Sequence, residues 1–127
     1  MRSVLVVRLS ARGDVMFATP IVRALRRTWP EARITWVVEP AASDVVRYHP
    51  ELDEVVVWDR PSWKRMWRER RWGDLRRAFR DFRAELRARR FDLALDMQGL
   101  LRSGLVSYFS GAPVRVVLGP QEGNRLF

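Results

Sequence analysis

The sequence contains no cysteine, and it has one lysine (Lys64) and one histidine (His49) among its 127 residues. Without cysteine the chain forms no disulfide and no thiolate metal site, which is compatible with a reducing compartment. A single histidine without cysteine is no metal site either, and His49 is interpreted as a turn residue before Pro50. No apolar run is long enough to span a bilayer. The run at residues 4–7 is too short for a signal peptide, because Arg8 ends it.

Arginine supplies nearly all of the positive charge. The chain has 24 basic and 15 acidic residues, which gives a net charge of +9. Genomic base composition accounts for part of an arginine bias, but a charge of this size favours a polyanionic partner such as a phosphorylated lipid, nucleic acid or an anionic membrane surface. Hydrophobic residues make up 47% of the sequence, so a packed core is expected, and the length suits one domain over residues 1–127.

Short apolar runs alternate with helical patterns along the chain. The apolar runs predict strands at residues 3–9, 33–38, 54–58, 93–97 and 114–118. A helix follows a turn at residues 10–14, and Pro20 fits a first helical turn with Thr19 as N-cap. Further helices are predicted at 41–47, from Asp74 onward, and at 101–109. This alternation is typical of a parallel α/β sheet with right-handed crossovers, which an antiparallel or all-helical structure would contradict.

The predicted turn at residues 10–14 (SARGD) follows the first strand. In open α/β sheets the chemistry sits at the carboxyl ends of the strands. Gly13 allows close approach of the backbone to a ligand or a left-handed conformation. Asp14 can deprotonate a hydroxyl as general base or cap the following helix, and the spacing alone favours the cap. The dinucleotide pattern G-x-G-x-x-G and the P-loop pattern are both absent.

Two stretches of the chain resemble a known family. The stretch VLVVRLSARGDVMFATPIVRALRRTWPEARITWVVE resembles the opening of the ADP-heptose:lipopolysaccharide heptosyltransferases, in which a strand, a turn ending Gly-Asp and a TP-x-x-RAL helix follow one another. The stretch FDLALDMQGLLRSGLVSYFSGAP resembles their second conserved segment, in which a strand ends in D-x-Q-G-L and a basic-Ser pair follows. Two motifs in this order are more specific than either alone. The resemblance is to glycosyltransferase family 9, and within it to heptosyltransferase I.

The resemblance implies the GT-B architecture, which has two Rossmann-like domains with a cleft between them. It makes residues 1–127 the N-terminal, acceptor-binding domain, and it implies that the C-terminal nucleotide-sugar domain is missing, so the chain alone is expected to be inactive. The implied reaction moves heptose from ADP-heptose to the Kdo/inner core of lipopolysaccharide with inversion, and it uses no metal or other cofactor. The family's general base falls on Asp14, which outweighs the cap, and Gly13 lies on the donor side of the turn.

Residues 60–72 (RPSWKRMWRERRW) hold six basic residues and one acidic residue, with Trp63, Trp67 and Trp72 interleaved. In a helix, Trp63 and Trp67 share one face. Composition alone leaves three interpretations of this segment. The most favoured is a helix whose tryptophans pack on their own domain, followed by a helix that lies on an anionic bilayer and then by a binding site for single-stranded nucleic acid. The resemblance implies that this segment meets the anionic Kdo-lipid A acceptor, with Lys64 and Arg65 in the family's W-basic-basic run binding its charged groups.

Other candidate residues follow the fourth and fifth predicted strands. Gln98 can bind a sugar hydroxyl or begin a helix, and the residues leave both alternatives open. Arg102 lies in the first turn of the next helix and can reach the cleft or solvent. Gln98 and Arg102 are predicted to bind the acceptor, and so is Arg125, whose segment EGNR resembles the family's loop after the fifth strand. Asp96 is expected to order the Gln98 turn instead of acting in catalysis.

Three interpretations follow from the sequence. The first is an enzyme domain that is peripheral on the cytoplasmic face of the inner membrane and has no nucleic-acid partner. It predicts a cleft with Asp14 and Gln98 in its wall, and with Lys64 and Arg65 at its rim. The second is a basic module for nucleic acid or anionic membrane, which predicts one continuous basic face. The third is an inactive fragment, which predicts an exposed apolar surface for a missing domain.

Overall fold

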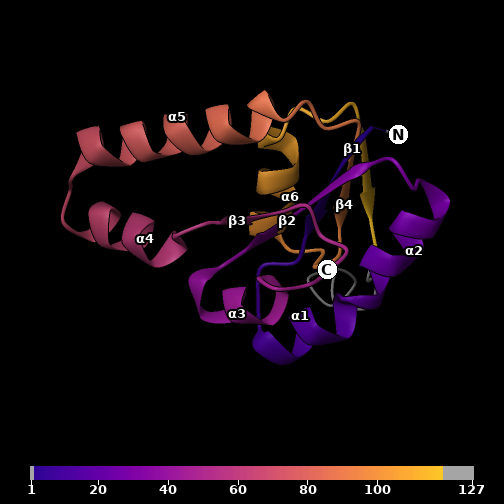
Figure 1. Ribbon diagram of the computed structural model, residues 1–127. Helices are drawn as coiled ribbons and strands as arrows, with labels where there is room; N and C mark the ends of the chain where they lie inside the picture. Colours follow the sequence, from indigo (N-terminus) through magenta and orange to yellow (C-terminus); the bar gives the residue numbers. More distant parts are fainter. Residues whose placement is uncertain (1, 119–127) are drawn as a thin grey trace.

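The computed structural model describes residues 2–118 and contains one sheet of five parallel strands (Figure 1). The strands lie in the order β3-β2-β1-β4-β5, and every neighbouring pair is parallel. They are β1 (Ser3–Val7), β2 (Arg33–Val38), β3 (Glu54–Val57), β4 (Leu93–Asp96) and β5 (Val114–Val117). The predicted Rossmann-like α/β fold class is confirmed.

Helices cover both faces of this sheet. They are α1 (Arg12–Ala18), α2 (Pro20–Thr28), the 3-10 turn η1 (Pro40–Ala42), α3 (Ser43–Val46), α4 (Arg60–Arg68), α5 (Trp72–Ala88) and α6 (Leu101–Phe109). Helices α1 to α3 pack on one face, and α5 and α6 pack on the other. Helix α4 and the beginning of α5 project beyond the β3 edge of the sheet (Figure 1). None of the helices in the described part of the chain is long and apolar enough to cross a membrane.

The central strand β1 supplies side chains to both layers of the core. Val4 and Val6 are fully buried in the cluster beneath α1 to α3, whereas Leu5 and Val7 are fully buried in the cluster beneath α5 and α6. Successive side chains of a strand point to opposite faces, so a strand covered on both faces is apolar at every position. The unbroken apolar run in the sequence therefore indicates that β1 is a central strand, covered on both faces.

Most differences from the predicted elements lie at their ends, and the helix expected after the first turn begins earlier and is divided into α1 and α2. The expected turn at residues 10–14 gives way to α1, whose first turn closes when the N–H of Val15 donates to the carbonyl of Ala11 at 2.8 Å. Helix α2 begins at Pro20 with Thr19 as its N-cap residue, as predicted. The long helix α5 begins two residues before Asp74. The β1 strand ends at Val7, two residues before the predicted end.

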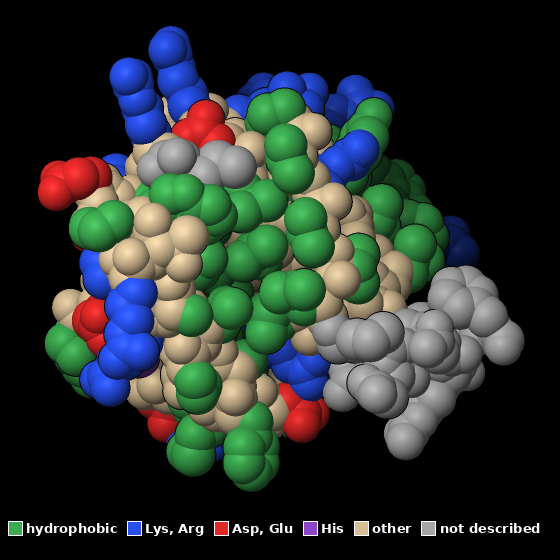
Figure 2. Space-filling model, turned by 90° about the vertical axis from the view of Figure 1, so that its right-hand side faces the viewer, with side chains coloured by type: hydrophobic (Ala, Val, Ile, Leu, Met, Phe, Trp, Pro, Cys, Tyr) green, Lys and Arg blue, Asp and Glu red, His purple; other side chains and the backbone are tan. Residues whose placement is uncertain are grey.

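Strand β5 forms the other edge of the sheet, and all four of its residues are exposed, unlike the buried residues of β4. Figure 2 looks onto this side of the molecule and shows hydrophobic side chains gathered there. On the α6 side, the guanidinium of Arg115 lies 5.1 Å from the centre of the Tyr108 ring. The sheet therefore has one apolar edge that no other part of the described chain covers.

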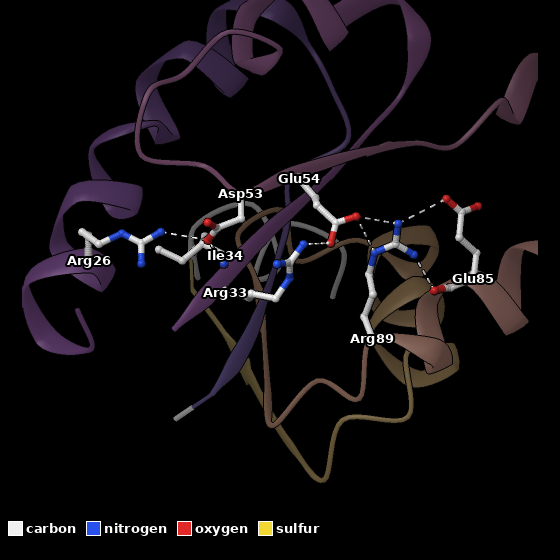
Figure 3. Close-up of polar contacts among 7 residues, drawn as sticks. All are labelled: Arg26, Arg33, Ile34, Asp53, Glu54, Glu85 and Arg89. Atoms are coloured by element: carbon white, nitrogen blue, oxygen red, sulfur yellow. Dashed lines mark hydrogen bonds and ion pairs between the residues drawn. The ribbon is translucent and has the colours of Figure 1, made fainter. Parts of the chain in front are cut away.

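Ion pairs join the amino-terminal ends of β2 and β3 (Figure 3). The Glu54 carboxylate accepts hydrogen bonds from Arg33 (2.7 Å, Nη2 to Oε1) and from Arg89 (2.9 Å, Nη2 to Oε2). These bonds, that from Arg33 foremost, hold the pKa of Glu54 below its ordinary value of 4.5. Glu54 thus connects the sheet to the end of α5, where Arg89 lies.

The neighbouring Asp53 is held in the same region. Its Oδ2 accepts from the backbone N–H of Ile34 at 2.7 Å and from Arg26 at 2.8 Å. Burial works against ionisation of Asp53, but the bonds from Ile34 and Arg26 lower its pKa below 3.8 in sum. Two adjacent carboxylates therefore stabilise this end of the sheet in their charged forms.

The pH dependence of stability tests the Glu54 contacts. Glu54→Gln is expected to lower the free energy of unfolding at pH 7 by about 1 kcal/mol, because charge-assisted bonds are lost in a partly exposed setting. The carboxylate has a lowered pKa in the folded chain, so its contribution is present above pH 4.5 and declines as the pH falls through the folded value. Urea unfolding at pH 7 and pH 3 measures this difference.

Glu31→Gln is the matched control, because it removes the same charge from an exposed residue that has no ion pair in the described part of the chain. It is expected to change stability little at either pH. An equal loss for Glu54→Gln at both pH values would show that the effect comes from packing and not from charge.

Candidate active site

Asp14 lies in the first turn of α1 and faces the carboxyl ends of the strands. Its side chain is 56% exposed, and its Oδ2 is 3.2 Å from Nη2 of Arg8, a side chain that is only 7% exposed. The Nη1 of Arg8 also donates to the carbonyl of Met97 at 2.8 Å, so the guanidinium is fixed between two loops. The N-cap of α1 is Ala11, so the alternative that Asp14 caps this helix is wrong. Asp14 is instead an accessible carboxylate held by a buried cation.

A cavity of about 340 Å³ opens beside this carboxylate. Its lining includes Asp14 and three residues from the loop and helix that follow β4, namely Gln98, Leu100 and Arg102. Parallel strands bring their carboxyl ends to one edge of the sheet, so residues far apart in the sequence meet here. The expected cleft with Asp14 and Gln98 in one wall is therefore present, and Arg102 belongs to it.

Gln98 is almost completely buried in this wall. Its Oε1 accepts from the backbone N–H of Leu9 at 2.8 Å and from that of Ser10 at 3.2 Å. This oxygen therefore fixes the loop that leads from β1 into α1, a role that neither sequence alternative included. Asp96 orders the turn as predicted, because its Oδ1 accepts from the N–H of Gln98 (3.0 Å) and of Gly99 (2.9 Å).

Arg102 belongs to a charged network that was not predicted. Its Nη2 donates to the hydroxyl of Ser10 at 3.0 Å, and its Nε lies 3.3 Å from Oε2 of the buried Glu39 at the end of β2. This Nε makes no hydrogen bond, so its contact with Glu39 is an ion pair alone. The same Glu39 oxygen accepts from Nε of Arg60 at 3.0 Å. One carboxylate thus joins the cavity beside Asp14 to the first residue of α4.

Helix α4 carries a second hollow of about 620 Å³. It is lined by Lys64 and Trp67 together with Arg60, Pro61 and Arg68. Arg65 is exposed but lines neither this hollow nor the cavity beside Asp14, and its Nη2 donates to the Ser62 hydroxyl at 3.2 Å. The expectation that Lys64 and Arg65 lie at the rim of the Asp14 cleft is therefore not met: Lys64 lies in a separate groove, which the Arg60–Glu39–Arg102 contacts link to the cavity beside Asp14.

The tryptophans of the basic segment have two different environments. Trp63 packs into the core against Trp58 (5.5 Å between ring centres) and Phe82 (5.7 Å). Trp67 and Trp72 remain outside, with their rings edge to face at 5.0 Å. Trp63 and Trp67 both lie on the side of α4 that faces α5, as expected, but Trp63 reaches the core whereas Trp67 lies beyond it and is exposed.

Gly13 and Arg125 complete the predicted set. Gly13 is the second residue of α1 and has no left-handed backbone, so that expectation is wrong. A Cβ at this position would meet nothing within 4 Å, which leaves the approach to the helix open. Arg125 lies outside the described residues.

Sequence reasoning missed three charged residues of this region, Arg8, Glu39 and Arg60. Arg8 and Glu39 each follow directly on an apolar strand run, and that position was a usable signal, because a charge there has to lie at the functional edge of a parallel sheet. Arg60 begins α4, where the sequence analysis treated it only as part of a basic run. No cluster of side chains suited to a metal ion occurs within residues 2–118.

The fold and the site together define a class of protein. A parallel sheet of this order with helices on both faces makes the chain a Rossmann-like α/β domain, the fold of the solved heptosyltransferases that it matches. The chain superposes on an Escherichia coli heptosyltransferase (WaaC) solved with ADP, with a TM-score of 0.76 at 24% identity over 94% of this chain and 36% of that one. A glycosyl transferase family 9 protein from Veillonella parvula gives a TM-score of 0.75 at 22% identity over 92% and 32%.

Sequence comparison finds relatives in one family. Residues 79–125 match Glycosyltransferase family 9 (heptosyltransferase). Lipopolysaccharide heptosyltransferase 1 of Pseudomonas aeruginosa is 34% identical over 113 residues, which are 87% of this chain and 31% of that protein. The enzyme of the same name from Escherichia coli K12 is 29% identical over 100 residues, or 79% and 30%. The chain is therefore a relative of the family 9 heptosyltransferases, as the sequence motifs predicted, and it spans about a third of the length of these curated relatives.

The hydrogen bonds of Gln98 give a test of the site's architecture. Gln98→Met keeps the volume but removes the oxygen that accepts from Leu9 and Ser10, so we expect the free energy of unfolding to fall by about 1–3 kcal/mol. Amide hydrogen exchange should accelerate at those two residues, whereas the amide of Ile34, which is bonded to Asp53 at the opposite end of the sheet, should be unchanged apart from the global loss. Unaltered exchange at Leu9 and Ser10 would mean that Gln98 does not hold this loop.

Proposed function

We propose that this chain is the acceptor-binding, N-terminal Rossmann-like part of an inverting heptosyltransferase of lipopolysaccharide core synthesis. The observation that carries the proposal is the Asp14 carboxylate beside Arg8 at the mouth of the 340 Å³ cavity, with Gln98 and Arg102 in the same wall. An accessible carboxylate beside a cavity that is also lined by Arg102 suits a general base for a sugar hydroxyl.

In the proposed reaction Asp14 takes the proton of an acceptor hydroxyl. The oxygen then attacks the anomeric carbon of ADP-heptose from the face opposite the nucleotide, the bond from that carbon to the ADP oxygen breaks, and ADP leaves with the electron pair. Attack opposite to the leaving group inverts the anomeric centre. No metal or further cofactor is required in this scheme. The donor is bound mainly by a nucleotide-sugar domain other than this chain, so the chain alone is proposed to bind acceptor without transferring sugar.

The acceptor is proposed to be the Kdo-bearing inner core on lipid A. Its carboxylates and phosphates suit the groove of Lys64, Arg60 and Arg68, and the Glu39 contacts lead from that groove to Arg102 and Asp14. Arg65 and Arg125 are kept as acceptor-binding residues on the resemblance alone. Because this acceptor is a membrane lipid, the protein is proposed to be peripheral on the cytoplasmic face of the inner membrane, with no nucleic-acid partner.

Acceptor binding can be measured on the chain itself. With a lipid-free Kdo-bearing sugar as probe, Lys64→Ala with Arg65→Ala is expected to weaken binding about tenfold, since each cation contributes on the order of 1 kcal/mol near an anionic partner. Lys64→Ala alone should account for most of the loss, because only Lys64 lines the groove. Isothermal titration calorimetry at physiological salt measures both.

The matched control is Arg76→Ala with Arg83→Ala, which removes the same charge from the exposed face of α5. It should leave the affinity for the sugar nearly unchanged. If the control pair weakens binding as much as the Lys64 pair, the attraction is unspecific and the groove is not the acceptor site. Tighter binding of a single-stranded oligonucleotide than of the sugar would favour the nucleic-acid module instead.

The catalytic role of Asp14 needs a polypeptide that also holds a nucleotide-sugar domain. There Asp14→Asn is expected to lower the transfer rate by about 10²–10⁴-fold, which is the usual effect of losing a general base. Asp44→Asn is the control, because the Asp44 side chain is equally exposed (55% against 56%) and is likewise paired with an arginine, Arg12, at 2.8 Å. Asp44→Asn should melt near the parent temperature, whereas Asp14→Asn is expected to melt earlier because it weakens the contact with the buried Arg8, so the rate is measured well below both melting temperatures. An Asp14→Asn protein that keeps its rate would refute the assignment.

A further inference from the structure

The end of the α4–α5 hairpin carries two exposed tryptophans. The turn between the two helices lies at the far end of the hairpin from the sheet (Figure 1). Trp67 before the turn and Trp72 after it are 64% and 50% exposed, although their rings contact each other at 5.0 Å. Large apolar side chains gathered at an exposed tip mark an interaction site, because their exposure to water is unfavourable.

Positive charge surrounds this pair of rings. Lys64 and Arg68 line the groove that also contains Trp67, and Arg70 lies in the turn itself. No carboxylate in the described part of the chain lies within ion-pair distance of any of these three cations. Arg71 is different, because it is paired with Asp74 at 2.8 Å. The tip thus combines two exposed indole rings with three cations that have no acidic partner, and this pattern complements an anionic surface with an apolar interior.

We infer that the tip formed by Trp67 and Trp72 docks on an anionic lipid bilayer, with the indoles at headgroup level and Lys64, Arg68 and Arg70 on lipid phosphates. Tryptophan rings favour the membrane interface, and each nearby cation adds attraction to anionic lipid. The inner part of the hairpin does not take part, because Trp63 is packed against Trp58 and Phe82. This inference rests on the peripheral-membrane part of the proposed function and assigns its contact residues.

The experiment compares binding of the 127-residue chain to vesicles of phosphatidylcholine with and without phosphatidylglycerol. Binding is expected only with the anionic lipid, and Trp67→Ala with Trp72→Ala should weaken it about tenfold through lost apolar burial. The control is Phe17→Ala with Tyr48→Ala, which removes two aromatic rings that are even more exposed, 87% and 84%, from the body of the molecule. This control should bind as the parent does.

A second variant separates docking from damage to the hairpin. Trp67→Phe with Trp72→Phe keeps two apolar rings, so it should retain binding within about threefold, but the blue shift of tryptophan emission on vesicle addition should disappear. Quenching by brominated lipid should disappear with it, because the remaining tryptophans lie away from the tip. Retention of the blue shift in this variant would overturn the inference.

The outcomes distinguish this inference from the proposed function. Equal vesicle binding by the parent and the Trp67→Ala, Trp72→Ala chain would exclude the tip as the contact, whereas the affinity for the lipid-free sugar tests the acceptor site separately. Absence of binding to anionic vesicles would also overturn the docking inference and leave acceptor binding intact. If a single-stranded oligonucleotide quenches the tip tryptophans and competes with the vesicles at lower concentration, the surface serves nucleic acid.

Discussion

A guanidinium buried at the end of the central strand has to be paired, and the loops at the carboxyl edge of the sheet are arranged around that requirement. An unpaired buried charge is strongly unfavourable, by several kcal/mol. Arg8 meets Asp14 in the first helix and the Met97 carbonyl in the loop after β4. The loop after β1 is further bonded to Gln98. The two loops therefore hold each other in place, and Asp14 takes its position from a residue that is itself out of reach of solvent.

The α4–α5 hairpin is attached to the body by different forces. Its inner end is packed through aromatic rings, with Trp63 between Trp58 and the phenylalanines of α5. Its first residue, Arg60, is anchored to Glu39 at the end of β2. Ring packing holds the hairpin against the sheet and does not involve the charged side chains of its outer end. These cations therefore remain available to a ligand. The groove of Lys64 and the cavity of Asp14 consequently keep a fixed relation through one buried carboxylate.

The parts of this structure that follow from local chemistry could be predicted from the sequence. Strand β2 and helix α6 have their predicted bounds, because an apolar run buried on both faces and a helical stripe between turn residues are local signals. The start of α1 at Arg12 was missed because Gly13 near its start is typical of a turn. Periodicity could not tell which tryptophan of α4 reaches the core, since that depends on the rings of Trp58, after β3, and of the phenylalanines in α5. The Glu39 network depends on contacts between distant segments, which no local pattern reports.

Within residues 2–118 no strand pairs with the outer side of β5, and this has a consequence for how the chain behaves at high concentration. A strand with one unpaired side is a template for pairing with the same strand of another molecule, above all when its side chains are apolar. In β5 the only charged side chain is Arg115, which lies over Tyr108. A single charge within a run of valines acts as a gatekeeper against such assembly. Resistance to aggregation at this edge therefore depends on the charge of one arginine and on the mutual repulsion of chains that each carry a net charge of +9. Salt screens both of these electrostatic effects.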